Sequence, residues 1–134
     1  RSPTGNMNSE FYKIYFCTKD LVSNEQIKVS KSYKGKKIVD IVDDIVKNYL
    51  NTDRDFTKKQ DTFGYYDFIV PTLRPLEAIS WLSNYARPTG SGINGTTGAD
   101  MVFFENKDGF NFKSIRTMLE QEPYKTYNYQ QNKY

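Results

Sequence analysis

The sequence contains no histidine and only one cysteine, Cys17. Without histidine the chain lacks the commonest general base and metal ligand, and neither a Ser-His-Asp nor a Cys-His catalytic site can be built. Cys17 cannot form a disulfide within the chain, and a zinc site would need further Cys or His ligands. We therefore expect Cys17 to be a small apolar residue of a strand, and we expect no metal and no cofactor.

Long apolar runs and a strong net charge are also missing. No run approaches the about 20 residues that a membrane-spanning helix needs, so we expect no membrane insertion. The formal net charge of +3 is too small to indicate a nucleic-acid partner by itself. The N-terminal residues show no signal-peptide pattern. Because the chain does not begin with Met, we expect it to be a piece of a longer protein.

Aromatic residues, by contrast, are abundant. They make up 16% of the 134 residues, as 11 Tyr, 9 Phe and 1 Trp, and this composition favours a core that contains β-strands. The length is most simply that of one domain. We place this domain at 10–127, with a flexible connector at 87–98. Residues 1–9 are expected to be a flexible or artificially added segment, and 128–134 a ragged C-terminal end.

Alternating or aromatic-rich segments predict the strands. Glu10–Cys17 (EFYKIYFC) has large apolar residues in both alternating sets, which is typical of a strand covered on both faces. In the segment QIKVSKSY the alternation places Ile27, Val29, Lys31 and Tyr33 on one face. The other predicted strands are Phe63–Val70, which Pro71 ends, and a hairpin of Met101–Glu105 and Phe110–Lys113. The turn is Asn106–Gly109, where Asp108-Gly109 supplies a position of positive φ.

Apolar residues spaced three and four apart predict two main helices. Lys36–Leu50 carries the stripe Ile38, Ile41, Val42, Ile45, Val46 and Tyr49. Pro75–Tyr85 carries the stripe Leu76, Ile79, Leu82 and Tyr85, with Trp81 nearby. A short third helix is expected at Ile115–Gln121, with Ser114 as its N-cap. The fold class is therefore α+β: an antiparallel sheet of about four to five strands with the two main helices packed on one face.

Candidate catalytic and ion-binding groups are few. Asp40 and Asp44 lie four residues apart on the first main helix, but on its polar face among lysines, which indicates a solvated surface. The loop that holds Asp53, Asp55 and Asp61 lacks the glycine and the closing glutamate of a calcium-binding EF-hand loop. The glycine-rich connector lacks the Lys-Ser/Thr pair of a phosphate-binding loop. We expect no catalytic residues and no enzymatic activity.

Two groups of residues remain as candidates for a partner interface. The first is the lysine run around the second strand, represented by Lys28, Lys31 and Lys34. It can protect an exposed strand edge from pairing, bind an acidic protein surface, or contact the phosphates of a nucleic acid. No signature of single-strand recognition supports the last alternative. The second group is the hairpin aromatics Phe104, Phe110 and Phe112, of which one face is expected in the core while another docks outside this chain.

A family resemblance joins these segments. The series YDFIVPTLRPLEAISWLSNYA and GADMVFFENKDGFNFKSIRTMLEQEPY resembles the second, α+β domain of the baseplate hub protein of contractile-tailed bacteriophages. The upstream segments FYKIYFC and QIKVSKSYKGKKIVDIVDDIV are similar to the passage from the first β-barrel of that family into this domain. The resemblance covers most of 11–127 and rests on the order and spacing of the segments.

The resemblance implies a structural virion protein without catalytic residues. Hub proteins form a homotrimer that joins the tail tube to the cell-puncturing spike, so the implied partners are other hub protomers, the tube, the spike and baseplate proteins. The implied location is the tail baseplate, after assembly in the host cytoplasm.

Two further functions stay open. A carbohydrate- or peptide-binding module of a surface protein is the main alternative, and an exposed Trp81 in a shallow groove would favour it, whereas a buried Trp81 would favour the hub. An enzyme that uses only Asp or Glu would need two carboxylates that converge in a pocket with raised pKa values.

Overall fold

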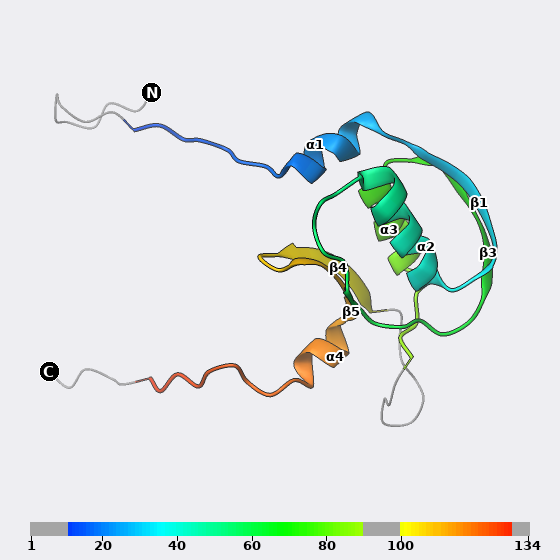
Figure 1. The fold of residues 1–134 in the computed structure, drawn as a ribbon. Coiled ribbons are helices and arrows are strands. Elements are labelled where there is room, and N and C mark those ends of the chain that lie inside the picture. The colour runs from blue at the N-terminus through cyan, green and yellow to red at the C-terminus, as the bar shows by residue number, and fades with distance from the viewer. Residues whose placement is uncertain (1–10, 90–99, 130–134) are drawn as a thin grey trace, which may run out of the picture.

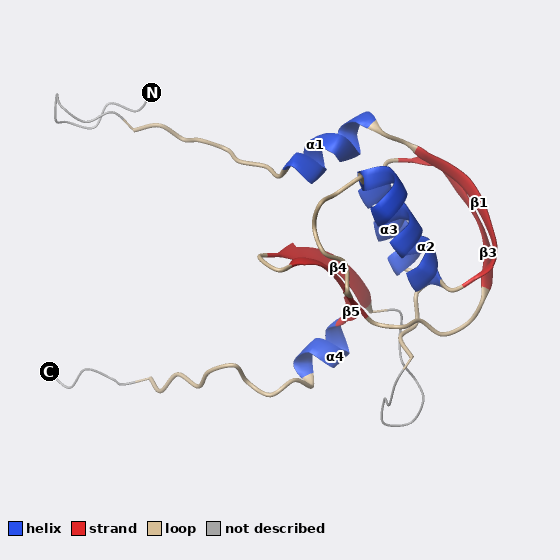
Figure 2. Cartoon of the chain, in the orientation of Figure 1, coloured by secondary structure: helices blue, strands red, loops and turns tan. Residues whose placement is uncertain are grey.

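Two central helices lie between two small β-sheets in the computed structural model, which describes residues 11–89 and 100–129 (Figure 1). The helices are α2 (Ile38–Ile45) and α3 (Pro75–Ser83). One sheet pairs β1 (Val29–Lys36) with β3 (Tyr66–Leu73), and the other has the order β2 (Lys58–Lys59), β5 (Gly109–Ser114), β4 (Met101–Asn106). Helices and strands are both well represented (Figure 2), so the predicted α+β class is confirmed.

The described strands form two sheets, whereas a single antiparallel sheet with helices on one face was predicted. The pairs β1–β3 and β4–β5 are antiparallel, but β2 pairs with β5 in parallel. A helix whose buried residues extend beyond one narrow stripe needs cover on more than one side. In α2 the additional buried residue is Val39, so the helix requires a neighbour on each side. The two sheets supply that cover.

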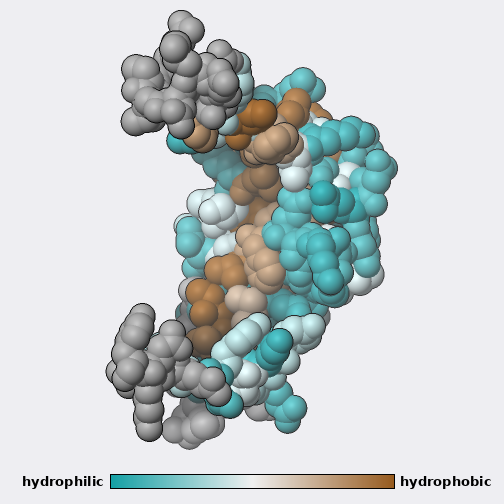
Figure 3. Space-filling model, turned by 90° about the vertical axis from the view of Figure 1, so that its left-hand side faces the viewer, coloured by the Kyte–Doolittle hydropathy of each residue, from teal (hydrophilic) through white to brown (hydrophobic). Residues whose placement is uncertain are grey.

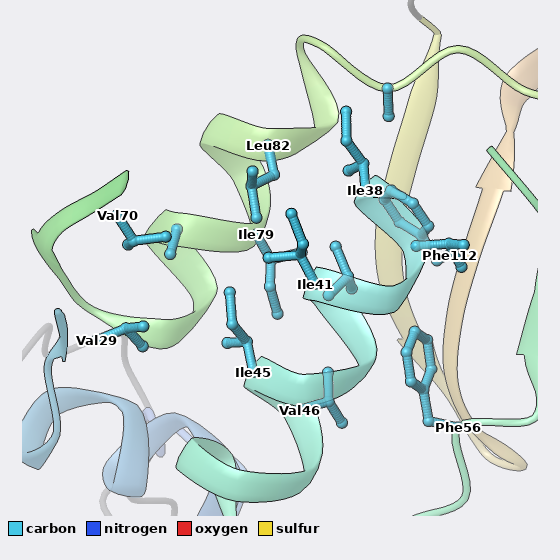
Figure 4. Packing of buried hydrophobic residues seen from close by; sticks show 14 of the residues in the cluster. Val29, Ile38, Ile41, Ile45, Val46, Phe56, Val70, Ile79, Leu82 and Phe112 are labelled. Atoms are coloured by element: carbon cyan, nitrogen blue, oxygen red, sulfur yellow. The ribbon is translucent and has the colours of Figure 1, made fainter. Parts of the chain in front are cut away.

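The core is built largely by the apolar stripes of the two helices (Figure 4). The predicted stripe of the second helix is confirmed only in part, because Leu76 is half-buried and Tyr85, which lies beyond the end of α3, is 48% exposed. In α3 the residues Ala78, Ile79 and Leu82 are all 0% exposed. The stripe of α2 is equally buried and continues into a π-helical turn, η1 (Val46–Leu50), which ends at Asn51 in the left-handed conformation. Burial of each such side chain stabilises the fold by about 1.5–3 kcal/mol. These stripes meet Val29 and Val70 of one sheet and Phe112 of the other in a single cluster.

Helix α1 (Lys19–Gln26) precedes β1, where the sequence predicts a turn or a single helical turn at 18–25. Thr18 caps it, because its hydroxyl accepts a hydrogen bond from the Leu21 amide at 3.4 Å. The helix is fixed to the body by polar contacts. The Asn24 side chain accepts a hydrogen bond from the Leu76 amide at the start of α3, at 2.8 Å. The apolar residues of α1 are therefore left largely outside the core.

The β1–β3 ladder is irregular. Val29 and Tyr33 are buried and Lys31 is exposed, and the register shifts between Val29 and Lys31 and again beyond Tyr33. Lys31 and Tyr33 share a face as predicted, because both contact Asp44 of α2. Strand β3 also continues to Leu73, whereas the sequence predicts an end before Pro71. In a two-stranded sheet both strands are edges, and an edge strand tolerates the missing N–H of a proline. Thr72 adopts a φ of 52° just after it.

The hairpin forms where the sequence predicts it, and its glycine has a second role. Gly109 has a φ of 125°, and a Cβ there would lie 2.2 Å from the Asp55 carbonyl oxygen. The next amide, of Phe110, donates to that same oxygen at 2.9 Å. Helix α4 (Ile115–Leu119) follows, capped by Ser114 and by the Asp100 carboxylate, which accepts from the Arg116 amide at 3.1 Å.

The strand predicted at 10–17 is not part of either sheet. Residues 11–18 belong to no helix or strand and run outward from α1 (Figure 1), while residue 10 lies outside the described residues. A segment with large apolar residues on both alternating sets needs neighbours on both faces. Both faces of the helix layer are already covered by β1–β3 and by β2–β5–β4. The prediction of a strand within this chain is therefore wrong, although the backbone is extended.

Other segment predictions fall partly outside the described residues. Of the connector 87–98, only 87–89 are described, and these are tied to the body: the Arg87 carbonyl accepts from the Phe63 amide at 2.8 Å and the Thr89 amide donates to the Asp61 carbonyl at 2.9 Å. Residues 1–9, 90–98 and 130–134 lie outside the described residues. Residues 128 and 129 are exposed and have no regular structure.

Candidate interaction surface

The three candidate lysines do not converge on one site. Lys28 lies in the link between α1 and β1, and Lys34 is exposed on β1. Lys31 turns to α2, where its ammonium group lies 2.8 Å from an Asp44 carboxylate oxygen and 5.0 Å from the centre of the Tyr33 ring. The lysines are therefore spread over β1 and the link before it, and one of them, Lys31, is engaged within the chain.

Asp44 is the centre of a small polar network on α2. It accepts hydrogen bonds from Lys31 at 2.8 Å, from the Tyr33 hydroxyl at 2.6 Å and from Asn48 at 2.9 Å. Partial burial alone would raise the pKa of Asp44, but the hydrogen bonds from Lys31 and Tyr33 outweigh it and hold that pKa below its usual value. Burial, and then the bond to Asp44, raises the pKa of Tyr33. These contacts fasten β1 to α2 and leave the carboxylate ionised, as expected of a structural pair.

The three candidate phenylalanines of the hairpin separate into two groups. Phe110 and Phe112 are buried in the core, 3% and 0% exposed, so their side chains present no surface to a partner. Phe103 is half-buried on the same side, where it stacks on Phe110 with ring centres 5.2 Å apart. Phe104 belongs to the other side of β4 and is half-exposed. Of the three, only Phe104 is placed to contact another molecule.

Trp81 is half-buried in an aromatic cluster between α3 and β3. Its ring centre lies 5.4 Å from that of Phe68 and 5.5 Å from that of Tyr85. The interplanar angles of 78° and 71° show that the rings turn edges toward faces. This arrangement packs the cluster on the body and forms no coplanar platform of the kind that stacks on a sugar.

The remaining polar candidates stay separate. Asp40 is exposed, whereas Asp44 is held in its network. Within 11–89 and 100–129, no group of three or more His, Cys, Asp or Glu residues is arranged to hold a metal ion. Cys17 is exposed in the outward-running segment, and it is not a buried strand residue. None of the described helices is both long enough and apolar enough to cross a membrane.

The most distinctive surface is an apolar band along one side of the molecule. Figure 3 shows hydrophobic residues running down the side where α1, the β4–β5 hairpin and α4 lie, between hydrophilic flanks. We define the apolar band by the exposed or half-exposed apolar residues of these elements: Leu21, Val22, Val102, Phe103, Phe104, Ile115, Met118 and Leu119. Contiguous exposed apolar surface of this kind marks a contact with another molecule.

Two aromatic segments leave the body on the same side. Residues 11–17, which we call the N-terminal arm, run outward from α1, and residues 120–129 run outward from α4 (Figure 1). The arm exposes five large apolar side chains: Phe11, Tyr12, Ile14, Tyr15 and Phe16. The C-terminal segment exposes three tyrosines: Tyr124, Tyr127 and Tyr129. Together with the apolar band they hold most of the exposed aromatic side chains, while Phe63, Tyr65 and Tyr85 are exposed elsewhere.

Comparisons with protein-family models, with curated proteins and with solved structures give no match to this chain. The fold and the surface therefore define the class: an α+β protein with an apolar band and an outward-running aromatic arm on one side.

Sequence reasoning identified the aromatic segments but missed how they are placed. Glu10–Cys17 was expected inside the sheet, and its surplus of large apolar residues on both alternating sets was the signal that it needs cover. It also missed Thr62, which is fully buried and whose hydroxyl accepts a hydrogen bond from the Val39 amide at 3.1 Å. No local pattern marks a cap that is 23 residues away from its helix.

Proposed function

We propose that this protein is a non-enzymatic structural module that works by protein–protein contact. The observation that carries the proposal is the concentration of exposed apolar side chains on one side, in the apolar band and in the arm (Figures 1 and 3). Leaving such surface in water is unfavourable, and a protein–protein interface is the usual reason for it.

We further propose that the assembly is the baseplate hub of a contractile-tailed phage, in which the chain joins other hub protomers, the tail tube, the spike and baseplate proteins. The support for this finer assignment is the order of the segments YDFIVPTL, RPLEAISWL, MVFFENKDGF and QEPY in the sequence. A rigid body that meets its neighbours through dry contacts fits this role.

Trp81 is half-buried and forms no exposed platform, which weighs against a carbohydrate-binding module but does not by itself select the hub. Its ring is engaged with Phe68 and Tyr85 in edge-to-face contacts, so the cluster contributes to the body of the protein. Binding to a glycan or peptide array by the purified chain, lost on Trp81→Ala without loss of folding, would reverse this preference.

The test of the proposed function is electron microscopy of the purified protein, together with its mass in solution. A closed particle with threefold symmetry is the expected result, because hub protomers form a trimer. A persistent monomer at high concentration, or a closed assembly of another symmetry, would overturn the hub assignment.

A further inference from the structure

We infer that the N-terminal arm, residues 11–17, forms a β-strand along the outer edge of β4 in a second copy of this chain. The inference deepens the proposed function, on which it rests for the existence of an assembly, by naming the partner and the contact. The arm and the edge are complementary in backbone hydrogen bonding and in side chains.

The arm has the sequence of a strand and lies outside both sheets. Tyr12, Ile14 and Phe16 alternate with Phe11, Lys13, Tyr15 and Cys17, so an extended backbone presents apolar side chains on both faces. Its backbone belongs to neither sheet among the described residues. A segment that needs cover on both faces and hydrogen bonds along its edge obtains all of these at once by joining a sheet.

Among the outer edges of the two described sheets, β4 alone lacks protection. β1 carries Lys31, Lys34 and Lys36, residues typical of a guarded edge. β3 contains Pro71, which lacks an N–H, and β2 has only two residues. β4 is six residues long, reads MVFFEN, contains neither lysine nor proline, and pairs only with β5 among the described strands. An edge of this composition is a template for an added strand.

The side chains of β4 also need cover on both faces. Phe103, on the core side, and Val102 and Phe104, on the other, are each only half-buried. A strand laid beside β4 places one alternating set against Phe103 and the other against Val102 and Phe104. The arm has aromatic residues in both sets, and aromatic pairs are favourable across neighbouring strands.

The geometry at the root of the arm favours a second copy over the same chain. Arg54 lies 3.3 Å from Asp20 of α1 and 2.9 Å from Glu105 of β4, so the arm begins beside the end of its own β4. Thr18, the N-cap of α1, has an extended backbone and directs the arm away from the body (Figure 1). Laying the arm on its own β4 would require the chain to reverse at this cap. An arm that points outward reaches a neighbouring copy instead, and repetition of that contact gives a ring when the rotation between copies closes.

The single cysteine gives a direct test, because Cys17 ends the arm. Unlabelled chain with its native Cys17 is mixed with isotopically heavy chain that carries Cys17→Ser and one new cysteine, and disulfides are equilibrated in a glutathione buffer. The new cysteine is Val102→Cys or Asn106→Cys, one near each end of β4, since the arm can run in either direction. Ser32→Cys, on the exposed surface of the lysine-bearing β1, is the matched control.

A mixed disulfide at one of the two β4 positions, at least tenfold more abundant than at Ser32→Cys, is the expected result. Ile14→Pro in the donor chain should abolish it by removing a ladder hydrogen bond, whereas Ile14→Val should preserve it. Equal yields at β4 and at Ser32→Cys would overturn the inference. So would a disulfide that forms within single chains carrying both Cys17 and a β4 cysteine, at high dilution.

The outcomes separate this inference from the proposed function. Threefold particles that persist with Ile14→Pro would overturn the pairing of the arm with β4 of a second copy, and they would leave the hub assignment standing. A mixed disulfide in a closed twofold assembly would support the pairing of the arm with β4 of a second copy and overturn the hub assignment.

Discussion

Helix α2 and the N-terminal arm are both rich in large apolar residues, yet they end in opposite environments. Ile41, Val42 and Ile45 of α2 are 0% exposed, whereas Phe11 and Phe16 of the arm are 85% and 89% exposed. The difference is one of spacing. In α2 the apolar residues recur at three and four and gather on a helix that this chain can cover. In the arm they occupy consecutive positions, which in an extended backbone face opposite sides, and the described chain leaves them exposed.

The comparison teaches that composition does not distinguish a core segment from an interface segment. A chain of this length has few elements that can cover apolar side chains. Both of its described sheets already pack against α2 and α3. We propose that a segment that needs cover on two further faces obtains it from another molecule. The following predictions test this contrast, beginning with the largest effect.

Charge in the core should unfold the protein, and charge on the arm should not. We expect Leu82→Asp or Ile45→Asp to abolish cooperative thermal melting, because each buries an unpaired carboxylate in a fully buried position. The cost exceeds about 4 kcal/mol, a large part of the about 5–15 kcal/mol that stabilises a typical domain. Ile14→Asp is the matched control and should melt as the unmodified protein does. Cooperative melting of either core variant, followed by circular dichroism, would show that the helix faces are misassigned.

The hairpin glycine should be the next most sensitive position. Gly109→Ala places a Cβ against the Asp55 carbonyl oxygen in a backbone conformation that side chains rarely adopt, and we expect a loss of about 2 kcal/mol or more in the free energy of unfolding. Gly35→Ala is the control: its φ is 56°, but no atom lies within 4 Å of the added Cβ. It should cost only about 1 kcal/mol. Urea titration measures both, and equal losses would contradict the close approach of Asp55.

The Asp44 network should make stability depend on acid. The folded-state pKa of Asp44 lies below its unfolded value, so its contribution is present above about pH 4, the ordinary range of an Asp carboxyl. It is lost as the pH falls through the folded-state pKa. We expect Asp44→Asn to lower the melting temperature at pH 6 and to have less effect at pH 3. Asp40→Asn, at an exposed position of the same helix, is the matched control for the loss of one carboxylate. A profile that Asp44→Asn does not flatten would contradict the role of the network.

The smallest effect on stability is expected in the arm. Ile14→Pro should change the free energy of unfolding of the dilute protein by less than about 0.5 kcal/mol, because the residue lies outside the core. The same change should reduce the mass of the assembly measured by light scattering at high concentration. A lowered melting temperature in the dilute protein would show that the arm already belongs to the body.

The fold was predictable where the apolar period is long and regular. The stripes of α2 and α3 are read directly from the spacing of residues such as Ile38, Ile45 and Leu82, and the hairpin from Asp108-Gly109. The division into two sheets was not, because β2 has only two residues and its parallel pairing with β5 leaves no pattern in the sequence. For the candidate site, the sequence showed that the hairpin is rich in aromatic residues. It did not show that Phe110 and Phe112 are buried while Phe104 is half-exposed, because that depends on the packing of the folded chain.

Amide hydrogen exchange of residues 11–17 as a function of protein concentration tests most directly whether the aromatic arm is covered by another copy. We expect these amides to exchange rapidly in dilute solution and to become protected, together with those of β4, as the concentration rises, while the amides of α2 stay protected throughout. Arm amides that exchange rapidly at every concentration, or that are protected already at the greatest dilution, would contradict the claim that another copy covers the arm.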